Sequence, residues 1–420
     1  MLAQARAEDF DFASILSAGD HIGWPQGTGE PTALTSRLAS QSDVLPPVTL
    51  VVGMVTSKTL DLPGMERFGY LCLNGAASTR KAVASSGGRV TPIHLSSIPG
   101  LIATRRIPID VALIRVRPTD DPTVYSLGVM VDFVHEMIEA ARIVVAEVDE
   151  TMPLTRCDAL LSRDHITHFA ISDVNGPEIA DPEPSAVELA VARHVAALIP
   201  DKATVQFGVG GMPVAVARAL EGHSNLGLHS GVIPDAAINL IEKGIITNRY
   251  KGIDSGVSVT GGLFGTRQLF SFAHNNDAIC MRRAAYTHSA ATLSQIGAFH
   301  SINSAIAIDL SGQVNAEMAG ARYLGAVGGQ VDFVRGGRLS PGGRSIIALT
   351  STTPDGKHSK IVGGLQGQPV TTARSDIDLV VTEFGVADLW GLDLNARAKA
   401  LIEIAHPDFR DALSRQAYDI

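Results

Sequence analysis

The sequence has few of the features that mark disulfide-stapled or membrane proteins. Its three cysteines, Cys72, Cys157 and Cys280, are far apart and form no CxxC pair. This usage favours a reducing, cytoplasmic setting and predicts neither a structural zinc site nor a disulfide scaffold. No uninterrupted apolar run reaches the roughly 18 residues of a membrane span, and the N-terminus lacks the basic start and apolar run of a signal peptide. We therefore expect a cytoplasmic protein with no membrane partner.

Basic charge and familiar cofactor motifs are also scarce. The 34 Lys and Arg residues against 43 Asp and Glu give a net charge of −9, which argues against a nucleic-acid partner because phosphate backbones require a basic surface. The sequence contains no HExxH, GxSxG, GxGxxG or Walker A motif. It therefore predicts no metal, no α/β-hydrolase serine, and no dinucleotide or ATP site. A phosphorylated cofactor stays compatible with the charge, since it needs only a local pocket of donors.

Glycine is plentiful by contrast, with 41 residues against an aromatic share of 5%, as the tight turns of alternating strand–helix folds require. A helical spacing covers residues 126–142, and Ser185 with Glu188 forms a capping box that opens a helix over 186–198. Buried parallel strands are predicted at residues 48–55, 111–116, 143–148, 203–207, 345–349 and 379–382. We predict an α/β protein with parallel-rich sheets in two open domains, 1–184 and 185–420, joined at the Pro-rich stretch 181–184.

Three glycine clusters are candidate anion sites. Residues 208–213 lie between a predicted strand and helix, where helix N–H groups can bind an anion, although a tight turn without a ligand explains the pattern equally well. Residues 261–266 follow the β-branched run 257–260. Residues 325–333 precede Arg335, Arg338 and Arg344, which could hold phosphates or lie in a solvated loop.

Histidine and cysteine side chains offer weaker candidates. Metal-ligand spacing is missing, so hydrogen-bonded structural roles are the better interpretation for His229, His288, His300 and His406. Cys280 could be a nucleophile, but a buried apolar role is commoner for a single cysteine.

The order of motifs along the chain resembles the acetyl-CoA hydrolase/transferase family, which includes 4-hydroxybutyrate, succinate and itaconate CoA-transferases. The matching segments span both halves and are Gly29-Glu-Pro31, 146–148 with Met152-Pro153, 207–213, 242–248, 301–305, 309–314, 328–333, 345–349, 381–389 and 405–410. The resemblance implies two open α/β domains of CoA-transferase type, assembled as a homodimer or higher homo-oligomer. It also implies coenzyme A, carried as acyl-CoA, and small carboxylic acids as substrates, without a metal.

The chemistry implied by the resemblance is covalent. A glutamate attacks the acyl-CoA thioester to give a mixed anhydride, the released thiolate converts it to a glutamyl-CoA thioester, and a second acid reverses the sequence. Each tetrahedral intermediate carries an oxyanion that needs N–H donors. By this resemblance the CoA-binding residues are Gly262, Leu263, Phe264, Gly265, Thr266, Lys360 and Glu383, the oxyanion donor is the Gly385 N–H, and the cleft residues are Glu30, Gly210, Gly211, Asn303 and Gln330. For Asn303 and Gln330 the alternative is structural hydrogen bonding.

The sequence departs from the family at the nucleophile. Counting back without gaps from residues 301–305 places the glutamate at Ala285, and no Asp or Glu occurs from Ala278 to His300. Three explanations follow: a glutamate replaced by alanine, a relative that uses another residue or activates water with a carboxylate such as Glu30 or Glu383, or an acyl-CoA binder without catalysis. The rivals to CoA transfer are thus an acyl-CoA hydrolase and a binding protein.

Substrate preference is indicated by two short segments. Residues 228–233 and 286–288 resemble the itaconate branch of the family, which implies small dicarboxylates such as itaconate or succinate. Arg282 and Arg283 flank Ala285 together with Tyr286. They would favour an anionic acceptor if they line a pocket, or would simply be exposed.

Overall fold

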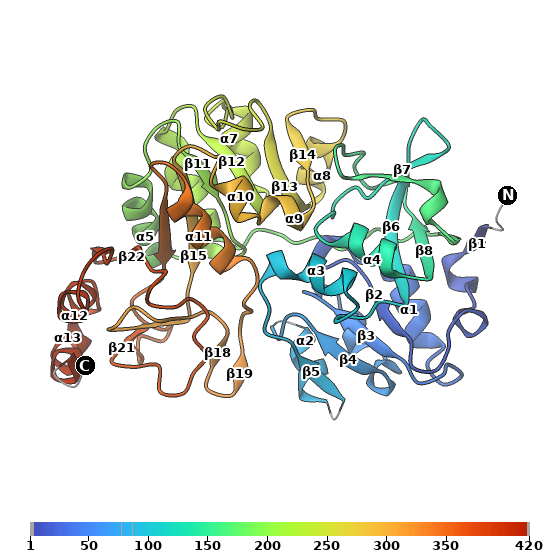
Figure 1. Ribbon diagram of the computed structural model, residues 1–420, viewed down its shortest axis with the longest axis horizontal. Helices are drawn as coiled ribbons and strands as arrows, with labels where there is room; N and C mark the ends of the chain where they lie inside the picture. The colour runs from blue at the N-terminus through green and yellow to red at the C-terminus, as the bar shows by residue number, and fades with distance from the viewer. Residues whose placement is uncertain (1–3, 77, 86, 418–420) are drawn as a thin grey trace. The chain divides into compact units, whose positions relative to one another are not determined.

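The computed structural model describes residues 4–76, 78–85 and 87–417, and these divide into two compact units (Figure 1). The first unit contains the chain up to Ala180 together with Val259–Thr287, and the second contains Asp181–Ser258 and the chain from His288 onward. The first crossing falls beside the predicted linker 181–184. The predicted domains, 1–184 and 185–420, do not include the later return of the chain to the first unit, over Val259–Thr287.

The first unit contains a parallel sheet with the strand order β1-β10-β8-β6-β2-β3-β4-β5. Strands β3, β4 and β5 follow in order on one side of β2, whereas β6 lies on its other side. The strand order therefore reverses between β2 and β6. The strands are β1 Gln4–Arg6, β2 His21–Gly23, β3 Thr49–Val52, β4 Gly69–Cys72, β5 Gly88–Val90, β6 Val111–Pro118, β7 Val124–Ser126, β8 Ile143–Val148, β9 Leu160–Ser162 and β10 His168–Ile171. Such a reversal is where ligands bind in open α/β sheets, beyond the carboxyl ends of the strands.

Helices and a late pair of strands complete the first unit. The helices are α1 Thr32–Ser40, α2 Thr79–Ala84, α3 Ile98–Ala103, α4 Val134–Ala140, α8 Arg267–Ala273 and α9 Ala284–Thr287, and the late strands are β13 Ser258–Leu263 and β14 Ile279–Met281, which are neighbours. Fully buried Leu50, Val52, Val111 and Leu113 belong to the core. Because both faces of a parallel sheet are covered, its strands are apolar almost throughout.

The second unit repeats this architecture with the strand order β12-β11-β15-β20-β22-β23, parallel except for β22 with β23. Here the order reverses between β11 and β15, because β12 lies on the other side of β11. The strands are β11 Thr204–Gln206, β12 Gly227–Ile233, β15 Phe299–Ser304, β16 Ala307–Asp309, β17 Val314–Asn315, β18 Met318–Ala319, β19 Arg322–Tyr323, β20 Arg344–Ala348, β21 Ile361–Val362, β22 Leu379–Thr382 and β23 Gly385–Asp388.

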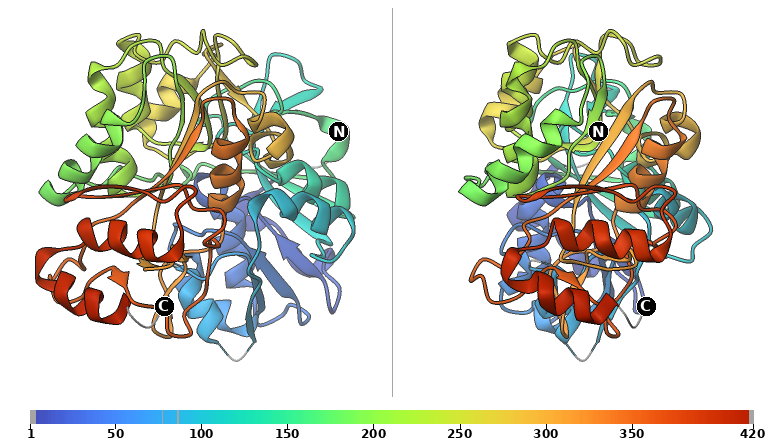
Figure 2. Two further views of the ribbon diagram at one scale, coloured as in Figure 1. Left: turned by 60° about the vertical axis from the view of Figure 1, so that its left-hand side comes forward. Right: turned by 90° about the vertical axis from the view of Figure 1, so that its left-hand side faces the viewer.

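The helices of the second unit are α5 Ala186–Ala197, α6 Gly211–Ala219, α7 Ala236–Glu242, α10 Ala290–Leu293, α11 Gln330–Leu339, α12 Leu394–Glu403 and α13 Pro407–Gln416. Helices α12 and α13 lie side by side near the C-terminus, as both views of Figure 2 show. The predicted capping box is confirmed, since Ser185 accepts from the Glu188 N–H and the Glu188 side chain accepts from the Ser185 N–H.

Sequence periodicity failed over residues 126–142. The predicted helix is wrong in its first half, because Ser126 ends β7, which forms a hairpin with β6, and only Val134–Ala140 is helical. Gly261 and Gly262 of the second glycine cluster lie inside strand β13, which continues the β-branched run before them. Among the described residues, no helix is long and apolar enough to cross a membrane.

Candidate active site

The predicted site residues fall into two groups, one in each unit, and each group is built separately. In the first unit the turn after β2 carries Glu30, which is fully buried. Its carboxylate accepts hydrogen bonds from Thr35 Oγ1 at 3.1 Å and Ser57 Oγ at 2.7 Å. Burial raises the pKa of the Glu30 carboxyl, and these hydroxyl donors oppose the rise. Glu30 therefore lies at the reversal of strand order, held there by these hydroxyl groups.

Phe264 packs against the same turn. Gly27, just after β2, has φ +58°, and a Cβ there would lie 2.4 Å from the Phe264 ring. The Leu263 carbonyl accepts from Thr28 Oγ1 at 2.7 Å, and the Leu263 N–H donates to the Val129 carbonyl at 2.8 Å. The segment Gly262–Gly265 is thus buried and fixed on the residues that follow β2, and Thr266, half-buried at the start of α8, is its accessible end.

Gly262 lies in close contact with Met130. A Cβ at this position would lie 2.4 Å from Met130 Cε. Any other residue would therefore push aside the end of the flexible Met130 side chain. The glycine in the predicted CoA segment thus has a packing contact that is independent of a ligand.

Ala285 is exposed on the single-turn helix α9. The Ala284 N–H donates to the Asp132 carbonyl at 2.7 Å, which fixes the start of the helix. Asp132 is buried with φ +28°, and burial raises the pKa of its carboxyl group to about 7.

The predicted basic pocket around Ala285 is largely neutralised within this unit. Arg282 lies 3.4 Å from the Asp158 carboxylate and 4.1 Å over the Tyr286 ring, and Arg283 lies 3.4 Å from Glu139. Both arginines are half-buried. Neither simple exposure nor an unpaired cationic pocket describes them, because a carboxylate lies beside one guanidinium nitrogen of each.

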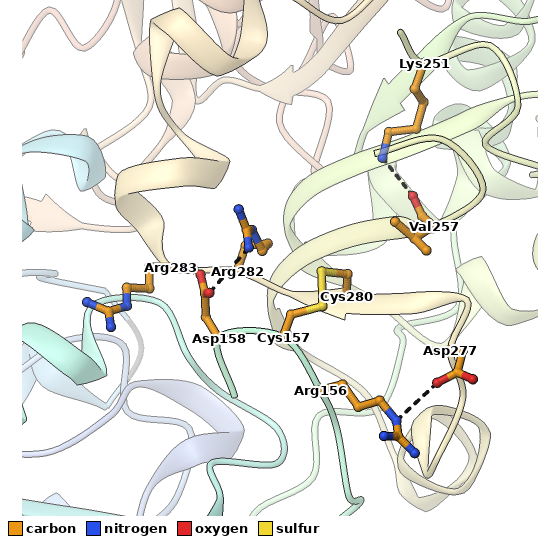
Figure 3. The surroundings of a disulfide bond; sticks show 9 residues. All are labelled: Arg156, Cys157, Asp158, Lys251, Val257, Asp277, Cys280, Arg282 and Arg283. Atoms are coloured by element: carbon orange, nitrogen blue, oxygen red, sulfur yellow. Dashed lines mark hydrogen bonds and ion pairs between the residues drawn. A yellow bond between two sulfur atoms is a disulfide. The ribbon is translucent and has the colours of Figure 1, made fainter. Parts of the chain in front are cut away.

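The expectation that the cysteines form no disulfide is wrong. Cys157 and Cys280 are bonded, with 5.6 Å between their Cα atoms (Figure 3). A separation of 123 residues hides this pairing from any spacing rule. Cys72 is buried in β4 with a free thiol, and burial raises the pKa of that thiol to about 12.

In the second unit the loop 208–210 follows β11, and α6 begins at Gly211. Gly210 has φ +111°, which favours glycine, and a Cβ on Gly211 would lie 2.6 Å from Glu188 Oε1. Asn303, at the end of neighbouring β15, donates from Nδ2 to Gln206 Oε1 at 3.2 Å. The structure therefore brings Gly210, Gly211 and Asn303 to the reversal of strand order in this unit.

Gln206 was missed by the sequence analysis. It is 2% exposed, and its Oε1 also accepts from the Ile302 N–H at 3.1 Å. A polar residue at the end of an otherwise apolar strand was the available signal. Its hydrogen bonds give Asn303 the structural role that was the alternative interpretation.

A cavity of about 560 Å³ opens beside this loop. Its lining includes Glu188, Gly211, Ser304, Thr350 and Lys360. Lys360 Nζ donates to Thr350 Oγ1 at 2.8 Å. Burial lowers the pKa of Lys360, while the charges of Glu188 and Glu383 oppose that shift. The cavity thus offers a lysine donor and a helix N-terminus to an anionic or polar ligand.

Glu383 and Gly385 lie at the turn between β22 and β23. The Glu383 carboxylate accepts from Ser351 Oγ at 2.6 Å and from the Ser351 N–H at 2.9 Å. Gly385 has φ +141°, whereas a Cβ there would meet nothing closer than 3.7 Å. Backbone conformation rather than space therefore requires this glycine.

Gln330 starts helix α11 and is 9% exposed. Its Nε2 donates to Thr372 Oγ1 at 3.1 Å. This bond matches the structural alternative given for Gln330.

Carboxylates lie beside the arginines after the third glycine cluster. Arg335 pairs with Asp376 at 2.9 Å, Arg338 lies 3.8 Å from Asp376, and Arg344 pairs with Asp378 at 2.7 Å. At Arg335 and Arg344 these carboxylates compete with a phosphate for the guanidinium donors. Within residues 4–76, 78–85 and 87–417, no group of three or more His, Cys, Asp or Glu side chains is placed to hold a metal ion.

Comparison with known proteins agrees with this two-unit α/β architecture. Residues 6–167 match the N-terminal domain of the acetyl-CoA hydrolase/transferase family, and residues 265–417 match its C-terminal domain. The chain belongs to the acetyl-CoA hydrolase/transferase family.

Relatives in this family are named as CoA-transferases. A 4-hydroxybutyrate coenzyme A transferase from Clostridium kluyveri is 38% identical over 406 residues, 96% of this chain and 95% of the relative. A succinyl-CoA:acetate/propanoyl-CoA:succinate CoA transferase from Fasciola hepatica is 39% identical over 81% of this chain and 72% of its own length. The crystal structure of RipA from Yersinia pestis has a TM-score of 0.91 and 31% identity, over 97% of this chain and 95% of that chain. The chain is thus an enzyme of CoA-transferase type.

Proposed function

We propose that the protein moves coenzyme A between small carboxylic acids, with dicarboxylates such as itaconate and succinate as its preferred substrates. The observation that carries the proposal is the cavity beside the loop 208–210, where Gly211 opens a helix and Lys360 supplies a cationic donor. A phosphorylated thioester needs such donors more than a broad basic surface. The succinyl-CoA chemistry named for the Fasciola hepatica relative also supports a dicarboxylate.

Four of the predicted site residues receive specific roles in this proposal. CoA is contacted by Lys360 and by Thr266, which lies at the accessible end of Gly262–Gly265. Glu383 positions the loop at Ser351 through its hydrogen bond. The Gly385 N–H stabilises the oxyanion, at a turn whose φ of +141° favours glycine. We also propose that the protein works as a homodimer or higher homo-oligomer.

The family's glutamyl-CoA step has no carboxylate to use at position 285, because Ala285 can form neither an anhydride nor a thioester. The proposal therefore predicts that Ala285→Glu adds this step. Wild type and Ala285→Glu, both with the Cys157–Cys280 disulfide intact, should be assayed with succinyl-CoA and itaconate, followed by borohydride trapping and mass spectrometry. We expect the variant alone to form itaconyl-CoA and to carry a borohydride-sensitive adduct at position 285.

A matched control keeps the size of the side chain while removing the nucleophile. Ala285→Gln should bind succinyl-CoA as Ala285→Glu does and form no adduct. If Ala285→Glu gains neither adduct nor turnover while binding CoA normally, the motif count has placed the nucleophile at the wrong residue. Release of free CoA without an acceptor would favour the hydrolase instead.

A further inference from the structure

Residues 156–158 are tied to the strand that precedes α9 by three neighbouring interactions (Figure 3). Arg156 pairs with Asp277 at 3.1 Å, the disulfide joins Cys157 to Cys280, and Asp158 accepts from the Arg283 N–H at 3.0 Å. The Asp158 N–H also donates to the Met281 carbonyl at 2.9 Å. The disulfide thus lies in the middle of a contact that ionic and backbone bonds hold on both sides.

Cys280 lies where nucleophilic chemistry is otherwise missing. The segment from Ala278 to His300 contains no Asp or Glu, and Cys280 is the one cysteine in that segment. Strand β14, which carries Cys280, is the neighbour of β13, and the Arg282 N–H donates to the Thr260 carbonyl at 2.7 Å. Strand β13 leads directly into Phe264–Thr266. The Cys280 sulfur is therefore on the strand beside the predicted CoA-binding segment.

The two cysteine residues differ in exposure. Cys157 is exposed and has φ +63°, whereas Cys280 is 9% exposed. A small thiolate that attacks the sulfur of the exposed residue, Cys157, breaks the S–S bond and releases Cys280 as a thiolate. A second thiol then removes the first as a small-molecule disulfide and leaves Cys157 reduced. Two small thiols thus supply the two electrons, and free coenzyme A is itself such a thiol.

We propose that Cys280 is a catalytic thiol that its bond to Cys157 masks and that reduction releases. The choice of acyl-CoA as its substrate rests on the proposed function. The Cys280 thiolate attacks the thioester carbonyl, an S-acyl bond to Cys280 forms, and CoA leaves as a thiolate. One thioester replaces another, so the acyl group keeps its activation.

The second half of the transfer also balances. The acceptor carboxylate attacks the S-acyl carbonyl and gives a mixed anhydride, while Cys280 leaves as a thiolate. The CoA thiolate then attacks the acceptor's carbonyl in the anhydride, which yields the new acyl-CoA and the donor's carboxylate. Water in place of the acceptor would give hydrolysis. The net reaction is the same as through a glutamate, but the enzyme carries the acyl group rather than CoA.

Reduction need not dismantle the site. The Arg156–Asp277 pair is exposed and adds only a small share to this contact. The Asp158 hydrogen bonds to Met281 and Arg283 involve backbone groups and remain without the disulfide. We therefore expect residues 156–158 to stay beside β14 after reduction, with the Cys280 thiol free.

The test compares oxidised and reduced protein across three cysteine variants. With succinyl-CoA, reduced wild type should release one CoA per chain in a burst and gain the mass of one succinyl group on Cys280, removable by hydroxylamine. Oxidised wild type should do neither. Cys157→Ser should be active without a reductant, Cys280→Ser inactive with or without one, and Cys72→Ala should behave as wild type.

Two results would overturn the proposal. One is reduced Cys280→Ser that transfers CoA as fast as reduced wild type, and the other is an adduct that carries CoA rather than succinate. Calorimetric binding of succinyl-CoA to Cys280→Ser separates this failure from failure of the proposed function. If Cys280→Ser binds and only turnover is lost, both proposals stand, whereas if wild type does not bind, the proposed function fails first.

Discussion

The contact between Gly27 and Phe264 gives the sharpest test of how the first unit holds the predicted CoA segment. In Gly27→Ala the new Cβ would lie 2.4 Å from the Phe264 ring at φ +58°. The left-handed backbone costs about 1–2 kcal/mol for a residue other than glycine, and overpacking adds about 1–3 kcal/mol. We therefore expect Gly27→Ala to lose about 2–5 kcal/mol of unfolding free energy.

Gly19 provides the matched control in the same unit. It also has positive φ, +89°, but a Cβ there meets nothing within 4 Å. Gly19→Ala should therefore lose only the backbone contribution of about 1–2 kcal/mol. Urea unfolding followed by far-UV circular dichroism measures both, and calorimetry measures binding of succinyl-CoA. Gly27→Ala should weaken binding by moving Phe264, and Gly19→Ala should not.

The comparison has a clear refuting result. If the two variants lose equal stability, the Phe264 ring does not occupy the space above Gly27. If Gly27→Ala loses stability but binds succinyl-CoA as wild type does, Phe264 and its neighbours do not position CoA.

Three further changes test other parts of the structure. Burial lowers the pKa of Lys251 from 10.5 to about 7, so between these pH values the unfolded chain holds a proton on Lys251 that the folded chain does not. The unfolding free energy should therefore rise with pH over this range by up to about 1.4 kcal/mol per pH unit, and Lys251→Met should flatten this slope in urea titrations. Gln206→Leu leaves the Ile302 N–H without its acceptor and should cost about 1–3 kcal/mol of unfolding free energy in urea titrations. Unchanged stability would show that this hydrogen bond does not hold the end of β15. Ser185→Ala removes the cap of α5 and should cost about 1 kcal/mol, whereas unchanged stability would deny the capping box any role.

Local patterns predicted much of the fold because the relevant forces act over a few residues. The capping box at Ser185 and the apolar strands β6, β8 and β22 follow from neighbouring side chains alone. The helical spacing over 126–142 misled because its first residue, Ser126, ends a strand that forms a hairpin with β6, and such a pairing overrides local preference.

Long-range pairings at the site could not be read from spacing. Arg335 and Arg344 looked free because Asp376 and Asp378 lie more than thirty residues further along the chain. Cys157 and Cys280 meet only because the chain returns to the first unit over Val259–Thr287. The glycines were found from sequence, but the reason for Gly262, contact with Met130, needed the structure.

The most direct test of CoA transfer is a single mass-spectrometric time course. Purified protein, reduced with a small thiol, is mixed with succinyl-CoA and isotopically labelled itaconate. The account predicts labelled itaconyl-CoA and free succinate in equal amounts, with the total thioester conserved. Free CoA rising in step with succinate, at the same rate with and without itaconate, would contradict transfer and identify a hydrolase.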